Sequence, residues 1–248
     1  MSANSGETTV VRQAAHVSGG RTVAAERGWS WIAEGWRMFR RAPGTWIGMA
    51  VVFAVIFFGL ALIPIVGAIA STVLTPVFVA GLVIASEKID KGGEPQFSDL
   101  FAGFQNKFGA LAAIGAIYLA GMIVITIGVL LTAGVSIFSL ADSSQQNPAA
   151  ALALLIAILV ILALMMPLLM AVWFAAPLVL FHELGAVDAM KGSFTGCLRN
   201  IIPFLVYGLI GTVFAVLASI PLLLGWLILG PVFAASVCAD YRDIFLAA

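Results

Sequence analysis

The chain has 248 residues, of which 62% are hydrophobic and only 10% are charged. Soluble domains carry about 25% charged residues, and a core of this size cannot absorb the apolar excess. The 12 basic and 12 acidic residues leave no net charge, so no basic field points to nucleic acid. Composition therefore predicts an all-α, polytopic membrane protein that binds no nucleic acid.

Residues 1–27 are rich in small and polar side chains and lack the apolar core of a signal peptide. This composition predicts a disordered cytoplasmic tail. Residues 28–248 are expected to form one membrane domain. Its targeting would then depend on the first membrane helix, acting as an uncleaved anchor.

An amphipathic helix is predicted directly after the tail, in "WSWIAEGWRMFRRAPG". At 100° per residue, one face is apolar and the opposite face is polar, which is typical of a helix lying in the membrane interface. The apolar face is expected to hold Trp29, Ile32, Ala33, Trp36 and Phe39. The polar face is expected to hold Ser30, Glu34, Arg37 and Arg41.

Six membrane-spanning helices are predicted from apolar runs that carry no charge. They cover residues 45–63, 68–86, 109–140, 149–181, 201–220 and 226–239. The third and fourth are longer than the roughly 20 residues that a bilayer needs, so they must tilt, kink or project. Pro167 and Pro177 are candidate kinks in the fourth span, and Pro76 and Pro231 are candidates in the second and sixth.

Two further amphipathic helices are expected in the polar connections, over residues 97–109 and 186–200. The chain then reads as three units, over about 28–90, 97–182 and 186–244. Each unit has an interfacial helix followed by a hairpin of two spans. Pro-Val-Phe occurs at residues 76–78 in the first unit and at residues 231–233 in the third, with Ala-Pro-Leu-Val at 176–179 as a looser match. The common order predicts an internal repeat.

The distribution of charge predicts the orientation. All twelve Lys and Arg lie before the first span, after the second, after the fourth or after the sixth. The opposite turns contain no basic residue. By the positive-inside rule, both termini are expected in the cytoplasm, with the chain in a bacterial inner membrane.

No motif for catalysis or for a cofactor is found. The predicted spans contain no Asp, Glu, Lys, Arg or His, which ion-coupled transporters place there. His182-Glu183 is interpreted as an ordinary pair at a helix end, because the sequence has no H-E-x-x-H motif. We therefore expect no enzyme, no metal and no cofactor.

Two features suggest contacts with partners. Arg37, Arg40 and Arg41 lie beside Trp36, a combination that serves as an anchor and is also a candidate contact for anionic lipid headgroups. Small residues at 112, 116 and 120 predict close helix packing, either within the chain or between two copies, so a homo-oligomer stays open.

The quoted stretch, together with "IPIVG", "LTPVFVAGLVIASEKIDKGG" and "FSDLFAGF", resembles a family of uncharacterised proteobacterial inner-membrane proteins. The chain is also distantly similar to membrane domains that accompany some glycerophosphodiester phosphodiesterases. The resemblance implies a six-span protein of the cytoplasmic membrane and lends no catalytic residue to any position.

Two functions follow as hypotheses. The first is a non-enzymatic protein that organises membrane lipids or an unknown membrane partner, motivated by uncharged spans and three amphipathic helices. The second is a transporter or channel for an uncharged or amphiphilic solute, motivated by the prolines in the returning spans.

Overall fold

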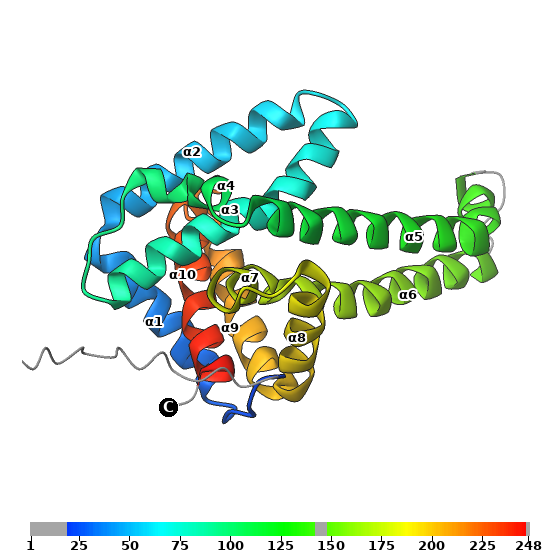
Figure 1. Cartoon of the computed structure of the whole chain (residues 1–248). Helices are drawn as coiled ribbons and strands as arrows, with labels where there is room; N and C mark the ends of the chain where they lie inside the picture. The colour runs from blue at the N-terminus through cyan, green and yellow to red at the C-terminus, as the bar shows by residue number, and fades with distance from the viewer. Residues whose placement is uncertain (1–18, 142–147, 247–248) are drawn as a thin grey trace, which may run out of the picture.

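The computed structural model of the protein describes residues 19–141 and 148–246 (Figure 1). The described residues form ten α-helices and one short 3-10 helix. In chain order they are α1 (Arg27–Arg41), α2 (Pro43–Ala61), α3 (Val66–Asp90), η1 (Phe97–Phe101), α4 (Ala102–Gln105), α5 (Phe108–Ala141), α6 (Pro148–Trp173), α7 (Ala175–His182), α8 (Ala186–Arg199), α9 (Ile201–Ser219) and α10 (Trp226–Phe245). The all-helical class is therefore confirmed.

Five stretches of the described residues are long and apolar enough to cross a membrane. They are Pro43–Ala61, Val66–Asp90, Phe108–Leu131, Leu154–His182 and Ile201–Ser219. The predicted sixth span falls in α10, which is not among them. The last six residues of α10 include Asp240, Arg242 and Asp243. A sixth crossing and the arrangement in three hairpins therefore stay predictions.

The N-terminal helix packs against the C-terminal one, so α1 and α10 lie side by side (Figure 1). Two glycines allow α1 to approach α9 and α10 closely. A Cβ atom on Gly28 would lie 2.3 Å from the carbonyl oxygen of Pro203 in α9, and one on Gly35 would lie 2.3 Å from that of Val232 in α10. Any larger side chain at either position would have to push backbone apart.

The predicted apolar face of α1 needs correction. Ile32 and Phe39 are buried as expected, but Trp29 and Trp36 point outward and are 50% and 44% exposed. The side chain that fills the core is that of Trp31, which is fully buried. Hydrophobic periodicity cannot separate an apolar side chain that meets protein from one that meets lipid, since both environments favour it.

Each short helix places a glycine against the residue that follows a proline in a returning helix. Gly103 of α4 lies against Val77, where a Cβ would be 2.1 Å from the carbonyl oxygen. Gly192 of α8 lies against Leu178 of α7, and Gly35 of α1 lies against Val232 of α10. The short helix of each predicted unit therefore packs on the Pro-containing helix of the preceding unit, and α1 closes the ring against the last.

The four candidate kinks behave differently. Pro76 lies within α3 and Pro231 within α10, and both helices are continuous through them. Pro167 likewise lies within continuous α6. The helix is interrupted at Phe174, between α6 and α7, three residues before Pro177. Proline cannot donate to the carbonyl four residues back, here that of Trp173, and its ring crowds that carbonyl.

Helix α8 satisfies the backbone groups that this break frees. The Ser193 hydroxyl accepts a hydrogen bond from the Phe174 amide at 2.9 Å and donates one to the Met170 carbonyl at 2.6 Å. Ser193 is fully buried. The interruption is thus a built part of the fold, because apolar surroundings leave no water to pair these groups.

Helices α5 and α6 run side by side away from the other helices as a long arm (Figure 1). At 1.5 Å per residue, the 34 residues of α5 make it about 51 Å long, against about 30 Å of hydrocarbon. The close approach of α5 to α3 is at Gly115, near the Val73 backbone. Ala116 and Ala120 of the predicted small-residue row are exposed instead.

The predicted tail ends earlier than expected. Residues 1–18 lie outside the described residues, but residues 20–23 are bonded to α8, to α10 and to Asn200 between α8 and α9. The Arg21 amide donates to the Ile244 carbonyl at 2.8 Å, and Asn200 bonds the backbone of both Arg21 and Val23 at 2.9 Å. Composition could not predict these bonds, because the polar residues of this segment are also typical of a disordered chain.

Candidate functional site

An ion network joins the two packed terminal helices to α3. Glu34 of α1 pairs with Arg242 of α10 at 2.9 Å and with Arg27 at 3.3 Å. Arg242 also pairs with Asp90 at the end of α3, and Arg27 pairs with Asp243 at 2.5 Å. Burial by itself lowers the pKa of Arg27, but the pairing with Asp243 and Glu34 raises it overall. The network fixes α1 against the ends of two other helices.

Three of the four predicted lipid-contact residues lie on the outward face of α1. Trp36, Arg37 and Arg40 are all exposed, and the Trp36 ring stacks on Phe39 with centroids 5.5 Å apart. Arg37 is 3.7 Å from Glu34, at the edge of the ion network. Because the opposite face of α1 is buried, this outward face is presented by a fixed helix.

The fourth predicted residue, Arg41, lies apart from the other three. Its Nη1 donates to the Ile89 carbonyl at 2.8 Å. Arg41 also lines a cavity of about 400 Å³ together with Ala42, Thr45 and residues 92–95. The predicted cluster of three arginines is therefore divided between an open helix face and a cavity.

Two other tryptophans near the arginines, Trp31 and Trp46, belong to the core. Trp31 donates through Nε1 to Asp243 Oδ2 at 2.7 Å. Trp46 is fully buried, and its Nε1 has no hydrogen-bond partner among the described residues. Tryptophan favours both a membrane interface and a core that offers its N–H a partner, so its presence near arginine did not decide between them.

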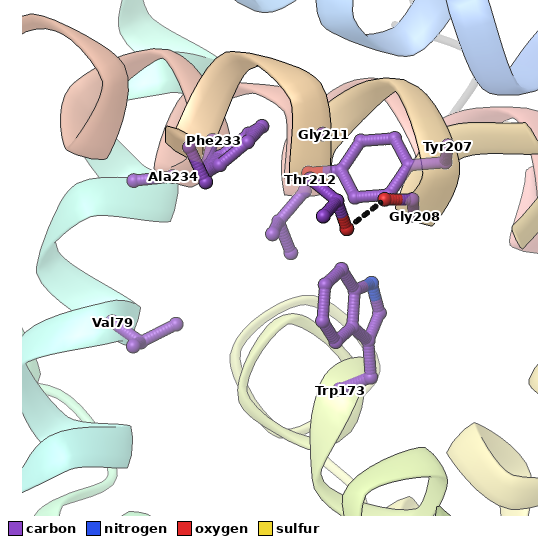
Figure 2. A pocket seen from close by; sticks show the side chains of 10 residues that line it. Val79, Trp173, Tyr207, Gly208, Gly211, Thr212, Phe233 and Ala234 are labelled. Carbon is purple, nitrogen blue, oxygen red and sulfur yellow. Dashed lines mark hydrogen bonds between the residues drawn. The ribbon is translucent and has the colours of Figure 1, made fainter. Parts of the chain in front are cut away.

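A second cavity of about 400 Å³ lies between α3, α6, α9 and α10 (Figure 2). Most of its lining is apolar, and Trp173 faces α9 across it. Polar groups at its wall are already bonded: Tyr207 pairs with Ser236 at 2.7 Å, and Thr212 donates to the Gly208 carbonyl at 2.7 Å. A further cavity of about 380 Å³, between α2, α3, α5 and α6, shares Trp173 as a wall.

Trp173 is held by a buried carboxyl group. Its Nε1 donates to Asp240 Oδ2 at 3.0 Å, and the Tyr241 amide lies 2.8 Å from Asp240 Oδ1. Asp240 is fully buried, and this burial raises its pKa well above the ordinary value despite both hydrogen bonds. Asp240 and Asp243 were not singled out from the sequence. The signal that could have found them is the pair of carboxylates directly after an apolar run.

His182 and Glu183 have separate partners. The His182 ring nitrogen Nε2 is hydrogen-bonded to the Tyr241 hydroxyl. Glu183 pairs with Lys107 at 3.0 Å, which links the end of α7 to the start of α5. Both bonds connect helix ends, of α7 to α10 and of α7 to α5.

The chain is 28% identical over 202 residues to a probable inner membrane protein of Burkholderia thailandensis. The alignment covers 76% of this chain and 73% of that protein. No protein-family model matches the chain, and no solved structure matches it. The similarity to membrane domains beside glycerophosphodiester phosphodiesterases therefore stays an expectation. The five apolar helices and this relative together identify a multi-pass helical membrane protein.

Proposed function

We propose that this protein is a non-enzymatic protein of the bacterial inner membrane that organises lipids, through the outward face of α1. The observation that carries the proposal is the exposure of Trp36, Arg37 and Arg40 on a helix whose other side is buried. Trp prefers the headgroup level, and each basic residue there contributes about 1 kcal/mol of attraction to anionic lipid. A partner protein on the same face is the competing occupant.

The test compares anionic and zwitterionic lipid. The full chain is reconstituted in nanodiscs of mixed phosphatidylglycerol and phosphatidylcholine, and lipids retained after detergent extraction are counted by native mass spectrometry. Phosphatidylglycerol should be enriched. Arg37→Gln with Arg40→Gln should lower the enrichment about thirtyfold, since removing two surface charges costs about 2 kcal/mol.

The matched control removes two other exposed cations, Lys91 and Lys191, also as Gln. This control changes the net charge equally and should leave the enrichment in place. Equal loss in both double variants would show general electrostatics without an α1 site. If neither lipid is enriched and one protein partner is captured instead, the outward face of α1 would be assigned to that partner.

We also propose the full topology of six spans in three repeated hairpins, with both termini in the cytoplasm. The glycine contacts at residues 35, 103 and 192 support the repeat, and the charge distribution supports the orientation. Alkaline phosphatase, which is active only outside the cytoplasm, should be active when fused at Ser143 or Leu222 and inactive after Ala248. The same activity at Leu222 and after Ala248 would eliminate α10 as a span.

A second candidate function is a transporter or channel for an uncharged or amphiphilic solute. The two largely apolar cavities that share Trp173 favour it. Ala215→Phe would fill the cavity of Figure 2, whereas Val216→Phe changes the neighbouring exposed position. In proteoliposomes, flux of a fluorescent amphiphile should fall only with Ala215→Phe. Equal flux in empty vesicles would reject this function for that solute.

A further inference from the structure

The cavity at Arg41 lies where two candidate spans end. Arg41, Ala42 and Thr45 flank the first turn of α2, and residues 92–95 follow the last turn of α3. Both helices are apolar enough to cross a membrane. A cavity at the shared end of two spans is at the depth of lipid headgroups.

The segment after the loop supports that depth. Phe97 and Phe101 of η1, Phe104 of α4 and Phe108 at the start of α5 are all exposed. The Phe101 and Phe104 ring centroids lie 6.4 Å apart, and those of Phe104 and Phe108 lie 5.8 Å apart. Exposed Phe side chains on short helices beside the ends of spans are typical of segments that lie in the membrane interface. The occupant we consider is therefore a lipid and not a soluble metabolite.

The walls of the cavity are held in place. The Gly93 amide donates to the Lys88 carbonyl at 2.8 Å, and Gly92 has a positive φ of 83° that closes the turn. After the loop, Asp99 accepts from the Gln96 amide at 2.8 Å and from Lys88 at 2.5 Å. The hydrogen bond from Arg41 to Ile89 fixes the remaining wall. The shape is thus set before any ligand binds.

The cavity contains one cation and one anion. Arg41 and Glu94 both line it, and among the described residues neither has an ion-pair partner within 4.0 Å. The nearby Lys91 is paired with Glu87 at 2.8 Å, so it does not neutralise Glu94. We propose that this cavity binds the headgroup of a lipid that carries both a phosphodiester and a primary ammonium, as phosphatidylethanolamine does.

The proposed roles follow from hydrogen-bonding chemistry. Arg41 would donate to the phosphate oxygens, and Glu94 would accept from the ammonium. A phosphatidylcholine headgroup has no N–H to donate to Glu94, and phosphatidylglycerol has no cation to offset it. The inference rests on the proposed lipid-organising function and adds a headgroup class at a second place, separate from Arg37 and Arg40.

The experiment offers the full chain, purified in mild detergent, equal amounts of phosphatidylethanolamine, phosphatidylcholine and phosphatidylglycerol with identical acyl chains. Native mass spectrometry then counts bound lipids. We expect the wild type to retain phosphatidylethanolamine about tenfold more than phosphatidylcholine, as expected for one charge-assisted hydrogen bond. Glu94→Gln should abolish this preference. Arg41→Gln removes the donor to the phosphate, which all three headgroups carry, so it should lower the retention of all three lipids in the cavity. Soluble phosphoethanolamine at the same concentration should not displace the lipid.

Matched controls separate this site from the α1 face. Arg40→Gln and Glu26→Gln change exposed residues outside the cavity and should keep the preference. Arg40→Gln should reduce only phosphatidylglycerol binding. Because Arg41 also bonds the backbone, Glu94→Gln carries the test if Arg41→Gln fails to fold. Equal retention of phosphatidylethanolamine and phosphatidylcholine, an unchanged preference in Glu94→Gln, or displacement by phosphoethanolamine would overturn the site and leave phosphatidylglycerol binding at α1 standing.

Discussion

The indole of Trp173 donates its N–H to the carboxyl group of Asp240, 67 residues further along the chain, at 3.0 Å. This contact ties the last residue of α6, just before the helix break, to α10. Trp173 is also a wall of both apolar cavities. The position of the Trp173 ring therefore shapes both cavities, and the buried carboxyl group of Asp240 holds that ring in place.

The loss of stability on replacing Asp240 should depend on whether the indole N–H of Trp173 keeps a hydrogen-bond acceptor. Asp240→Leu leaves Trp173 Nε1 without an acceptor in a buried place, so we expect a loss of about 1–3 kcal/mol in the free energy of unfolding. Asp240→Asn keeps a carbonyl oxygen there and should lose less than about 1 kcal/mol. Thermal unfolding in detergent measures both. Equal losses would show that the hydrogen bond contributes nothing.

The raised pKa of Asp240 predicts a pH dependence. Burial makes the folded protein hold this proton more tightly than the unfolded chain does. The stabilisation is complete below the unfolded pKa of about 4 and is lost as pH rises toward the folded value. Unfolding scans from pH 4 upward should therefore show a falling midpoint in the wild type. The fall of the unfolding midpoint with pH should be smaller in Asp240→Asn. An identical pH dependence in the two proteins would show that other titrating groups cause it.

Trp31 and Trp36 should respond differently to the same substitution. Trp31→Phe removes the 2.7 Å hydrogen bond to Asp243 and leaves a gap in the core, so we expect a loss of about 2–3 kcal/mol. Trp36→Phe changes an exposed ring and should change the free energy of unfolding by no more than about 0.5 kcal/mol. Chemical unfolding of the two variants compares them directly. A larger effect at Trp36 would reverse our assignment of the buried face of α1.

Gly35 should accept no side chain. In Gly35→Ala the new Cβ would lie 2.3 Å from the Val232 carbonyl oxygen, so α1 must move away from α10, at about 1–3 kcal/mol. A Cβ on Gly59 in α2 would meet nothing within 4 Å, so Gly59→Ala should be neutral or stabilise by up to about 1 kcal/mol. Thermal unfolding midpoints test the pair. A stable Gly35→Ala would contradict the close packing.

Ser193 should matter more than Thr195 in the same helix. Ser193→Ala removes the acceptor of the Phe174 amide and leaves the Met170 carbonyl with only the Cys197 thiol at 3.6 Å, which should cost about 1–3 kcal/mol. Within the described part of the chain, the Thr195 hydroxyl bonds only to the Lys191 carbonyl of its own helix, so Thr195→Ala should have little effect. Hydrogen exchange at Phe174 gives the local readout. Unchanged protection in Ser193→Ala would show that another group satisfies the break.

Apolar runs in the sequence predicted the membrane class and the long helices, because span length depends only on composition and bilayer thickness. Pro76, Pro167, Pro177 and Pro231 were candidate kinks, and the helix is interrupted three residues before Pro177. The helices are continuous through the other three prolines. Proline removes one hydrogen bond in each case, and the packing around it decides whether the helix breaks.

The arrangement of the proposed lipid-contact residues was predicted only in part. Charge and aromatic content singled out Arg37, Arg40 and Trp36, but not the separation of Arg41 from them. That separation depends on a contact with Ile89, 48 residues away in sequence. The role of Trp31 likewise depends on Asp243. Helical periodicity reports neighbours on one helix, and these partners come from other helices.

The packing of α1 on α10 has a consequence for the order of events during synthesis. The hydrogen bond from Trp31 cannot form until the ribosome has added Asp243, 212 residues later. At 5–20 residues per second, that interval is about 10–40 s. Until α9 and α10 have been made, the glycine-bearing side of α1 has no final partner, so the first helix of the described chain is among the last to reach its native place. A nascent chain stopped before Asp243 should leave Trp31 open to quenchers, and completion of α10 should shield it.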